Sequence, residues 1–352
     1  MQKLDPVQGI LAIIDDASFT GTNKLSLLLV ILDLAPMVSK ESRLMSLDDI
    51  VEKTLELHWN HSDVFAFTDG TRQVKQLGVL NRNNIEPVIQ VERVKSTLES
   101  SFKYEIARAR ADQNVWQEAR RKIRSGLLKN PIKKLQNLPG EHEPFLYEMS
   151  ADKKHLQFFP GVIEDLVRWG GVLRPVIELH YLNFVLKANK TESHQDDLYT
   201  FLFGEDRSMP PLTVRPRLWE LQNKKCIYSG EPLAKPIKTK QQQLDHVLPW
   251  SRIRMSVIEN FVLTDGETNG EKSALLLSAD MLEKWLTFMD SKHDKLVEIA
   301  QEHAWPSDRN RVIQGLKALY STEVPPVVWE PKHVFQMSAQ EQKRAIQLLE
   351  AS

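Results

Sequence analysis

Apolar residues recur at helical spacing along most of the first hundred residues. The leucine-rich segment 22–34 is long enough for three helical turns and predicts a helix. A second helix is predicted after Ser46, because serine is a favourable N-cap and two aspartates follow in the first turn. Asp69-Gly70, within 65–80, is typical of a turn between two short strands. Two helices and a hairpin make a winged-helix unit, but many unrelated α-rich domains share this order, so both interpretations stay open.

Helical patterns continue through the rest of the N-terminal half. Apolar positions recur over 160–190, where Pro175 is expected to separate two helices. The polar segment 190–216 is typical of a connection and places the main domain boundary near residue 210. We therefore expect a helical N-terminal region over 1–100, a helical region with a basic segment over 101–210, a small unit of different pattern over 211–280, and C-terminal helices that pack on this unit over 281–352.

The composition is that of a folded protein with about two domains. Hydrophobic residues make up 41% and charged residues 26% of the 352 positions, which is enough apolar surface for real cores. No apolar run reaches the roughly 18 residues that cross a bilayer, and the first residues are too polar for a secretory signal. The single cysteine, Cys226, excludes a disulfide framework. A cytoplasmic protein without membrane contact is expected.

The formal net charge of −1 means that any surface for nucleic acid must be local. The basic segment 101–135 is the strongest candidate, with ten lysines and arginines against three acids. One interpretation is a surface that follows the phosphates of DNA. The other is a solvated helix face, which is the commoner origin of a charge run, and both stay open. The residues singled out for DNA contact in this segment are Arg120, Arg121, Lys122 and Arg124.

Residues 224–276 carry the pattern with a chemical interpretation. A short strand is predicted over 243–248, a second over 260–264 and a helix over 267–276, which together make a small ββα unit. In such a unit Asp245, near the end of the first strand, can approach Asn269 in the first turns of the helix. Carboxylate and amide oxygens are hard ligands that suit Mg²⁺ or Mn²⁺.

The remaining polar residues of this unit suit phosphodiester hydrolysis. His246 would be a suitable general base, since the unperturbed pKa of histidine is about 6.5. Asn260 could hold its ring by a hydrogen bond or through the backbone. Lys272 could contact a phosphate, and Arg252 and Arg254 are further candidates for DNA contact because they follow the first strand.

These residues carry a resemblance to a known family. Asp245-His246, Asn260 and Asn269-x-x-Lys272 resemble the signature of HNH endonucleases, whose unit is the ββα-metal fold. The lead-in Cys-Ile-Tyr-Ser-Gly-Glu-Pro-Leu at 226–233 is similar to the HNH domain of type II RNA-guided CRISPR effectors, and so are the intervals of 14 residues from His246 to Asn260 and nine from Asn260 to Asn269. The resemblance covers about residues 217–277. The chain is too short for a guide-RNA effector, so it resembles a stand-alone HNH endonuclease with a helical N-terminal region.

The resemblance implies a role for each matching residue. His246 is then the general base, Asp245 and Asn269 hold the Mg²⁺ or Mn²⁺ ion, and Asn260 orients His246. Many HNH proteins also bind a structural zinc through two Cys-x-x-Cys pairs. Because Ser229 stands where the first pair needs its second thiol, no structural zinc is expected here.

The function implied by the resemblance is hydrolysis of DNA by a one-metal mechanism, in a mainly α-helical protein with a small ββα-metal unit. HNH effectors serve in bacterial restriction and anti-phage systems, often with a partner ATPase or sensor subunit, so a defence role is the context that the family implies. One site cuts one strand, and double-strand cleavage would require a homodimer or two encounters. The alternative function is an inactive or partner-dependent HNH module that binds DNA for regulation.

Overall fold

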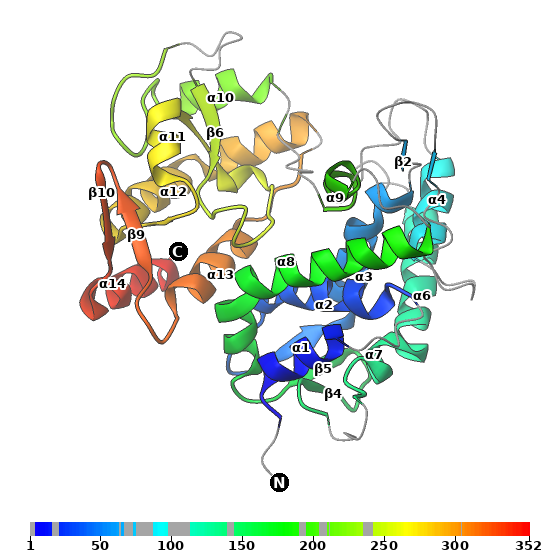
Figure 1. The fold of residues 1–352 in the computed structure, drawn as a ribbon. Helices are drawn as coiled ribbons and strands as arrows, with labels where there is room; N and C mark the ends of the chain where they lie inside the picture. The colour runs from blue at the N-terminus through cyan, green and yellow to red at the C-terminus, as the bar shows by residue number, and fades with distance from the viewer. Residues whose placement is uncertain are drawn as a thin grey trace. The chain divides into compact units, whose positions relative to one another are not determined.

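The chain divides into two compact units, Met1–Asp206 and Arg207–Ser352, in a computed structural model (Figure 1). The structure describes residues 4–15, 21–62, 65–66, 73–74, 87–97, 113–138, 144–189, 195–203, 210, 212–234, 242–303 and 305–352. Among these residues, no helix combines the length and the apolar character needed to cross a membrane.

The N-terminal unit is built mainly from helices. Its described helices are α1 (Pro6–Asp15), α2 (Asn23–Leu34), α3 (Leu47–His58), α4 (Pro87–Ser96), α6 (Gln113–Lys129), α7 (Pro131–Lys134), α8 (Val162–Ala188) and α9 (Gln195–Phe203), with short 3-10 turns at Ala35–Met37 and Asn60–Ser62. Its strands are β1 (Leu44–Ser46), β2 (Phe65–Ala66), β3 (Gln73–Val74), β4 (Tyr147–Met149) and β5 (His155–Phe158). The antiparallel order β1-β5-β4 makes one small sheet, and β2 pairs with β3.

Helix α2 is the centre of this unit. It is buried along nearly its whole length and packs against α3 and α8, which explains why its sequence is leucine-rich on all sides. The predicted cap of α3 is confirmed, since the Ser46 hydroxyl accepts a hydrogen bond from the Asp48 N–H at 3.1 Å. The pairing of β2 with β3 confirms a hairpin, but the predicted turn at Asp69-Gly70 lies outside the described residues. The comparison with a winged-helix unit stays a prediction.

The prediction that Pro175 separates two helices is wrong. Helix α8 runs without a break from Val162 to Ala188 and carries Pro175 inside it (Figure 1). Proline removes the N–H that would bond the Gly171 carbonyl, but both residues are exposed, so water can solvate this carbonyl. Leu173 and Ile177 on the opposite side are buried, and their packing holds the two halves in line.

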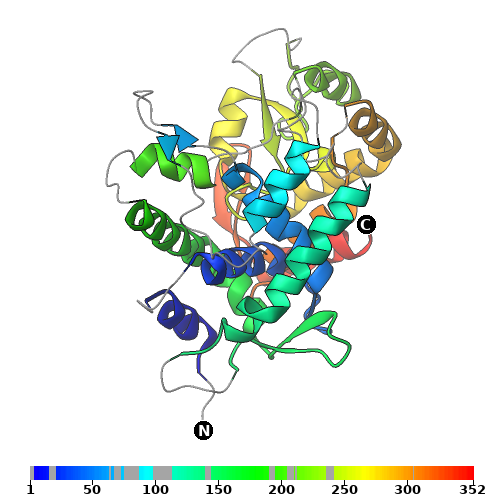
Figure 2. The same ribbon diagram turned by 90° about the vertical axis from the view of Figure 1, so that its right-hand side faces the viewer.

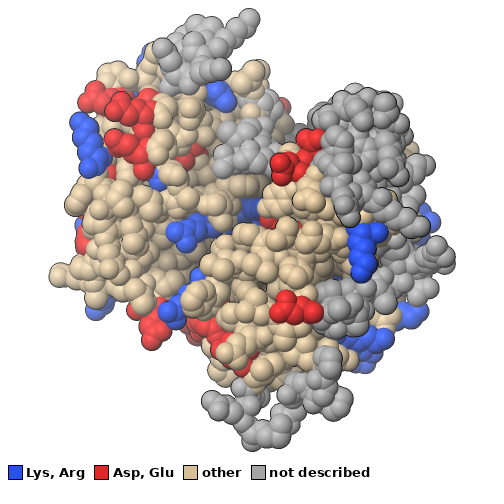
Figure 3. All heavy atoms as spheres, in the orientation of Figure 1, with Lys and Arg blue, Asp and Glu red and all other residues tan. Residues whose placement is uncertain are grey.

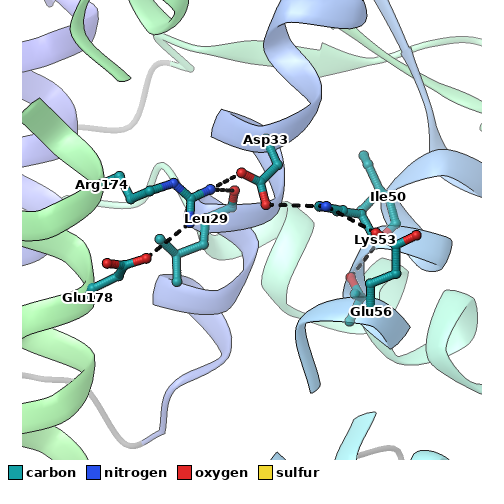
Figure 4. A network of polar contacts seen from close by, with 8 residues as sticks. Leu29, Asp33, Ile50, Lys53, Glu56, Arg174 and Glu178 are labelled. Atoms are coloured by element: carbon teal, nitrogen blue, oxygen red, sulfur yellow. Dashed lines mark hydrogen bonds and ion pairs between the residues drawn. The ribbon is translucent and has the colours of Figure 1, made fainter. Parts of the chain in front are cut away.

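A network of buried and partly buried charges ties α8 to α2 and α3 (Figure 4). The Arg174 guanidinium of α8 forms ion pairs with Asp33 of α2 and, at 3.1 Å, with Glu178 one turn along its own helix. Lys53 of α3 lies 3.6 Å from the other Asp33 oxygen. The Tyr199 hydroxyl of α9 donates to Glu178 at 2.7 Å. The charges are therefore paired, as buried charges must be.

Two buried histidines of the same unit predict a pH-dependent stability. Burial lowers the pKa of His58 to about 4 from the ordinary 6.5, and burial together with the neighbouring His58 lowers that of His61 to about 3. The folded state therefore binds fewer protons than the unfolded chain, so the stabilisation is complete above pH 6.5 and is lost as the pH falls.

At pH 5 this linkage costs about 2 kcal/mol of unfolding free energy for each histidine. The measurement is urea denaturation at pH 7 and pH 5. A His58→Gln variant should lose less stability than the unchanged chain between these two values. An equal loss would contradict the assignment to these rings.

The C-terminal unit combines two small sheets with helices. Its described helices are α10 (Val214–Leu221), α11 (Gly266–Lys272), α12 (Ala279–Glu302), α13 (Arg309–Tyr320) and α14 (Ala339–Glu350), with a 3-10 turn at Ile258–Asn260. Strand β6 (Gln242–His246) pairs antiparallel with β7 (Phe261–Asp265). Strand β8 (Leu276–Leu277) pairs parallel with β9 (Val327–Glu330), which pairs antiparallel with β10 (His333–Gln336). The segments 211–280 and 281–352 thus belong to one compact unit.

Candidate functional site

The candidate site is built on β6, β7 and α11. In this hairpin Asp245 lies opposite Val262, and His246 lies opposite Phe261. The following Asp265 begins α11, because its carboxylate accepts from both the N–H and the hydroxyl of Thr268 at 2.8 Å. The predicted strands and helix lie at these places with shifted ends. Helix α11 stops at Lys272 rather than continuing to residue 276, because the backbone turns at Ser273 to a φ of 46°.

Two residues of β6 face two residues of α11. Side chains alternate along a strand, so Gln243 and Asp245 share one face. The Asn269 amide N–H donates to Gln243, and the Lys272 ammonium lies 3.0 Å from the Asp245 carboxylate. Asn269 and Lys272 are three apart and therefore lie on one side of the helix. We call these four residues the strand–helix seam; it contains both of the predicted metal ligands.

The surroundings of Lys272 do not favour the predicted contact with a DNA phosphate, which stays a prediction. Its side chain is fully buried, with 0% exposure. The ammonium donates to the His246 carbonyl at 2.8 Å and contacts the Asp245 carboxylate. Strand β6 passes directly over the last turn of α11, and that packing leaves the lysine no route to the surface. Lys272 is a partner of Asp245 and of the backbone of His246.

The Asp245 carboxylate has a second close partner in Tyr228, whose hydroxyl donates to its Oδ2 atom at 2.7 Å. Burial raises the pKa of the Asp245 carboxyl, against the opposing effects of the Lys272 ammonium and the Tyr228 hydroxyl. Burial and the adjacent carboxylate raise the pKa of Tyr228, so the phenol stays protonated as a donor. In the sequence Tyr228 stands out only as part of the lead-in segment 226–233.

His246 lies on the opposite face of β6 from Asp245. Its ring packs against that of Phe261, with centroids 4.5 Å apart, and against Trp250 at 5.5 Å. The Nε2 atom is 3.5 Å from the Ser256 hydroxyl, at the limit of a hydrogen bond. The residue is 7% exposed. The imidazole is thus held by two aromatic rings at the end of the strand.

Asn260 acts on the backbone and not on the imidazole. Its fully buried amide accepts from the Leu248 N–H at 2.7 Å and donates to the carbonyls of Leu248 and Met255 at 3.1 and 2.9 Å. The Val247 N–H also donates to the Asn260 carbonyl at 2.9 Å. Of the two roles that the sequence left open, these contacts favour the backbone one. Asn260 fixes the chain directly after His246.

A tight turn at Cys226–Gly230 precedes the hairpin. The Gly230 N–H donates to the Cys226 carbonyl at 2.9 Å, and Gly230 has a φ of +76°, which only glycine adopts without strain. The Cys226 sulfur lies 3.3 Å from the Thr264 hydroxyl of β7. The turn is thus attached to the hairpin through a cysteine–threonine contact.

The donor atoms of the seam fit a hard divalent cation. The Asn269 side-chain amide donates its N–H to the Gln243 side-chain carbonyl, which leaves the Asn269 amide oxygen available as a ligand. The Oδ2 atom of Asp245 is 2.7 Å from the Tyr228 hydroxyl and 3.0 Å from the Lys272 ammonium, whereas Oδ1 is 3.3 Å from that ammonium. The backbone N–H of His246 also bonds the carboxylate. Over the described residues there is no group of three or more His, Cys, Asp or Glu side chains able to hold a metal. A metal here would therefore rest on one carboxylate and one amide.

The residues singled out for DNA contact differ in their surroundings. Arg252 is exposed and Arg254 is half-buried, in the segment that joins β6 to β7. On α6, Arg120 forms an ion pair with Glu52 of α3 at 2.9 Å, and Arg124 with Asp48 at 2.7 Å. Figure 2 shows α6 beside α4, and α6 also packs on α3.

Lys122 pairs with Glu118 on its own helix, and Arg121 is exposed. Three of the four α6 residues are therefore engaged in ion pairs, which favours a structural role for them. Acidic and basic side chains are interspersed on the face drawn in Figure 3.

The comparison with protein families matches the segment that contains this site. A family model described as HNH endonuclease matches residues 226–276, from the Cys226 turn to β8. The chain contains an HNH endonuclease domain. An HNH domain is a nuclease domain, and it suggests DNA as the substrate. The matched residues include the whole seam, His246 and Asn260, whereas the N-terminal unit lies outside the match. Neither the curated proteins nor the solved structures gave a match to the chain.

Proposed function

We propose that this protein is a divalent-metal-dependent DNA endonuclease with His246 as its general base. The observation that carries the proposal is the seam, because β6 places Asp245 against α11 and the next residue of the same strand is His246. Asp245 and Asn269 would hold the Mg²⁺ or Mn²⁺ ion. When bound, the ion would supply Lewis-acid stabilisation of the charge that develops on the phosphate oxygens.

The residues of the chain supply the other parts of the reaction. Neutral His246 accepts the proton of the attacking water on a ring nitrogen. Phe261 and Trp250 fix the plane of its ring, and Asn260 fixes the backbone that follows it. Lys272 supplies the counter-charge of the Asp245 carboxylate. In this arrangement the general base His246 and the metal ligand Asp245 lie on opposite faces of β6.

Nicking of a supercoiled plasmid by the purified full chain tests the proposal. Open circular and linear DNA should form in Mg²⁺ or Mn²⁺ and not with excess EDTA, which removes the metal. Products are expected to carry 5′-phosphate and 3′-hydroxyl ends. Absence of nicking under all of these conditions would overturn the proposal of an enzyme active by itself.

A regulatory module is the second candidate, and one observation favours it. Asp245 is only 5% exposed and already has a lysine as counter-charge, so its charge is balanced without a metal ion. Retained DNA binding without nicking would support this function. Nicking that begins only on addition of a partner ATPase or sensor subunit would support a role in restriction or anti-phage defence. Cleavage that rises with the square of protein concentration would indicate a homodimer.

The exposed part of the basic segment yields a separate prediction. Arg121, Lys129 and Lys133 are exposed. If this face follows phosphates, Arg121→Glu should lower the slope of log affinity for duplex DNA against log salt by about one. Fluorescence anisotropy at several salt concentrations gives the slope. Lys187→Glu on α8 makes the same charge change elsewhere in this unit and should leave the slope unchanged. Equal slopes for the two variants would mean that the basic face of α6 is solvated and does not contact DNA.

A further inference from the structure

The contact of Tyr228 with Asp245 is a feature that neither the predicted roles nor the proposed reaction uses. The Tyr228 side chain is buried, with 1% exposure, yet its only polar atom is 2.7 Å from a carboxylate oxygen. A phenylalanine would fill the same space. The hydroxyl is therefore the part of the side chain whose presence packing does not explain.

Three contacts fix the place of this hydroxyl. The turn Cys226–Gly230 carries Tyr228, and the Cys226 sulfur contacts Thr264 of β7. The Tyr228 ring meets the Trp329 ring of β9 edge to face, with centroids 5.5 Å apart and planes at 81°. The aromatic ring is thus held from the hairpin side and from the C-terminal sheet, so that the O–H reaches Asp245 without freedom to swing away.

Tyr228 and Lys272 both contact the Oδ2 atom of Asp245. Tyr228 takes Oδ2 from the side of the turn, and Lys272 approaches from α11, at 3.0 Å from Oδ2 and 3.3 Å from Oδ1. With Oδ2 bonded twice, the carboxylate cannot rotate about its Cβ–Cγ bond without breaking a buried hydrogen bond. Oδ1, which has the longer of the two contacts with Lys272, is the oxygen that would face a cation.

We propose that Tyr228 is a positioning residue, whose hydroxyl fixes the Asp245 carboxylate so that Oδ1 is presented to the divalent ion. The inference rests on the proposed function, since it assumes that Asp245 is a metal ligand. Residues that hold a ligating carboxylate by hydrogen bonds support metal affinity, and their loss typically costs 10- to 100-fold. The Cys226–Leu233 segment then does more than pack in the core, because it places the Tyr228 hydroxyl against Asp245.

The test is the affinity of the full chain for Mn²⁺, measured by the electron paramagnetic resonance signal of the free ion. Tyr228→Phe removes one oxygen atom and keeps the ring against Trp329. We expect its Mn²⁺ affinity to fall by about 10- to 100-fold. Tyr320→Phe is the matched control, because its buried hydroxyl donates to the Leu277 carbonyl in the same unit and does not touch Asp245. An unchanged affinity in Tyr228→Phe, or an equal fall in both variants, would overturn the inference.

Circular dichroism shows whether each variant is folded. If Tyr228→Phe does not fold, Trp329→Phe replaces it, because the smaller ring loosens the edge contact that holds Tyr228. Unchanged Mn²⁺ affinity there would likewise overturn the inference. The failure of the proposed function looks different, since the unchanged chain would then neither bind Mn²⁺ at this site nor nick DNA. If the unchanged chain nicks DNA and the Tyr228→Phe variant binds Mn²⁺ with unchanged affinity, only the positioning role of Tyr228 is contradicted.

Discussion

A His246→Ala variant should lose about 10²- to 10⁴-fold of the plasmid-nicking rate of the unchanged chain, which is the usual contribution of a general base. The imidazole is the group of the HNH domain that can take a proton from water near neutral pH. Alanine leaves the seam intact, because Asp245, Asn269 and Lys272 lie on the other face of β6. The measurement is the single-turnover nicking rate in Mn²⁺ with enzyme in excess.

Two controls separate chemistry from folding in this experiment. The affinity for duplex DNA should stay within a few-fold of that of the unchanged chain. His333→Ala removes an exposed histidine of β10 in the same unit and should cut at the normal rate. His246→Gln keeps more of the contact with Phe261 and Trp250 and should be as slow as the alanine variant. A nicking rate equal to that of the unchanged chain in either His246 variant would contradict its role as the base.

An Arg174→Met variant should lower the free energy of unfolding of the N-terminal unit by about 3–5 kcal/mol, the usual cost of breaking a buried ion pair. Methionine keeps most of the aliphatic stem but removes the charge that pairs with both Asp33 and Glu178 (Figure 4). Lys53 lies 3.6 Å from Asp33 and compensates only one of these two carboxylates. Glu178 would keep the Tyr199 hydroxyl as a partner and lose the Arg174 cation.

Urea denaturation followed by circular dichroism measures the loss. Domain stabilities of about 5–15 kcal/mol are typical, so the variant should unfold at a clearly lower urea concentration. Arg93→Met is the control, because Arg93 and Glu118 are about half exposed and 3.8 Å apart in the same unit. An exposed pair contributes about 0–1 kcal/mol. Equal midpoints for Arg174→Met and Arg93→Met would show that the Figure 4 network does not stabilise the unit.

The local signals of the sequence were sufficient wherever a few neighbouring residues decide the structure. Ser46 caps α3 because the serine and the Asp48 N–H that it accepts from are two residues apart in the chain. Asp265 begins α11 for the same reason. The signal for α8 was misleading, since Pro175 breaks helices on average. The buried side of that helix, which only packing provides, outweighs the lost hydrogen bond.

The signals that found the HNH domain were spacings and residue types. These spacings identified Asp245, His246, Asn260 and Asn269 together as candidate site residues. The family comparison supports the domain that contains them. Gln243 could have been found by the same reasoning, because it precedes Asp245 by two residues and therefore shares its face of the strand. Tyr228 had only its place in the lead-in segment as a signal.

By itself the sequence determined the helical character of the chain, the strand–strand–helix order at 242–272 and the family of that segment, because these depend on short-range patterns. Only the tertiary structure decided which charges meet. Lys272 and Asp245 are 27 residues apart, and Arg174 and Asp33 are 141 apart. Whether a lysine reaches a phosphate or a buried carboxylate depends on the strand that packs above it, and no local pattern specifies that strand.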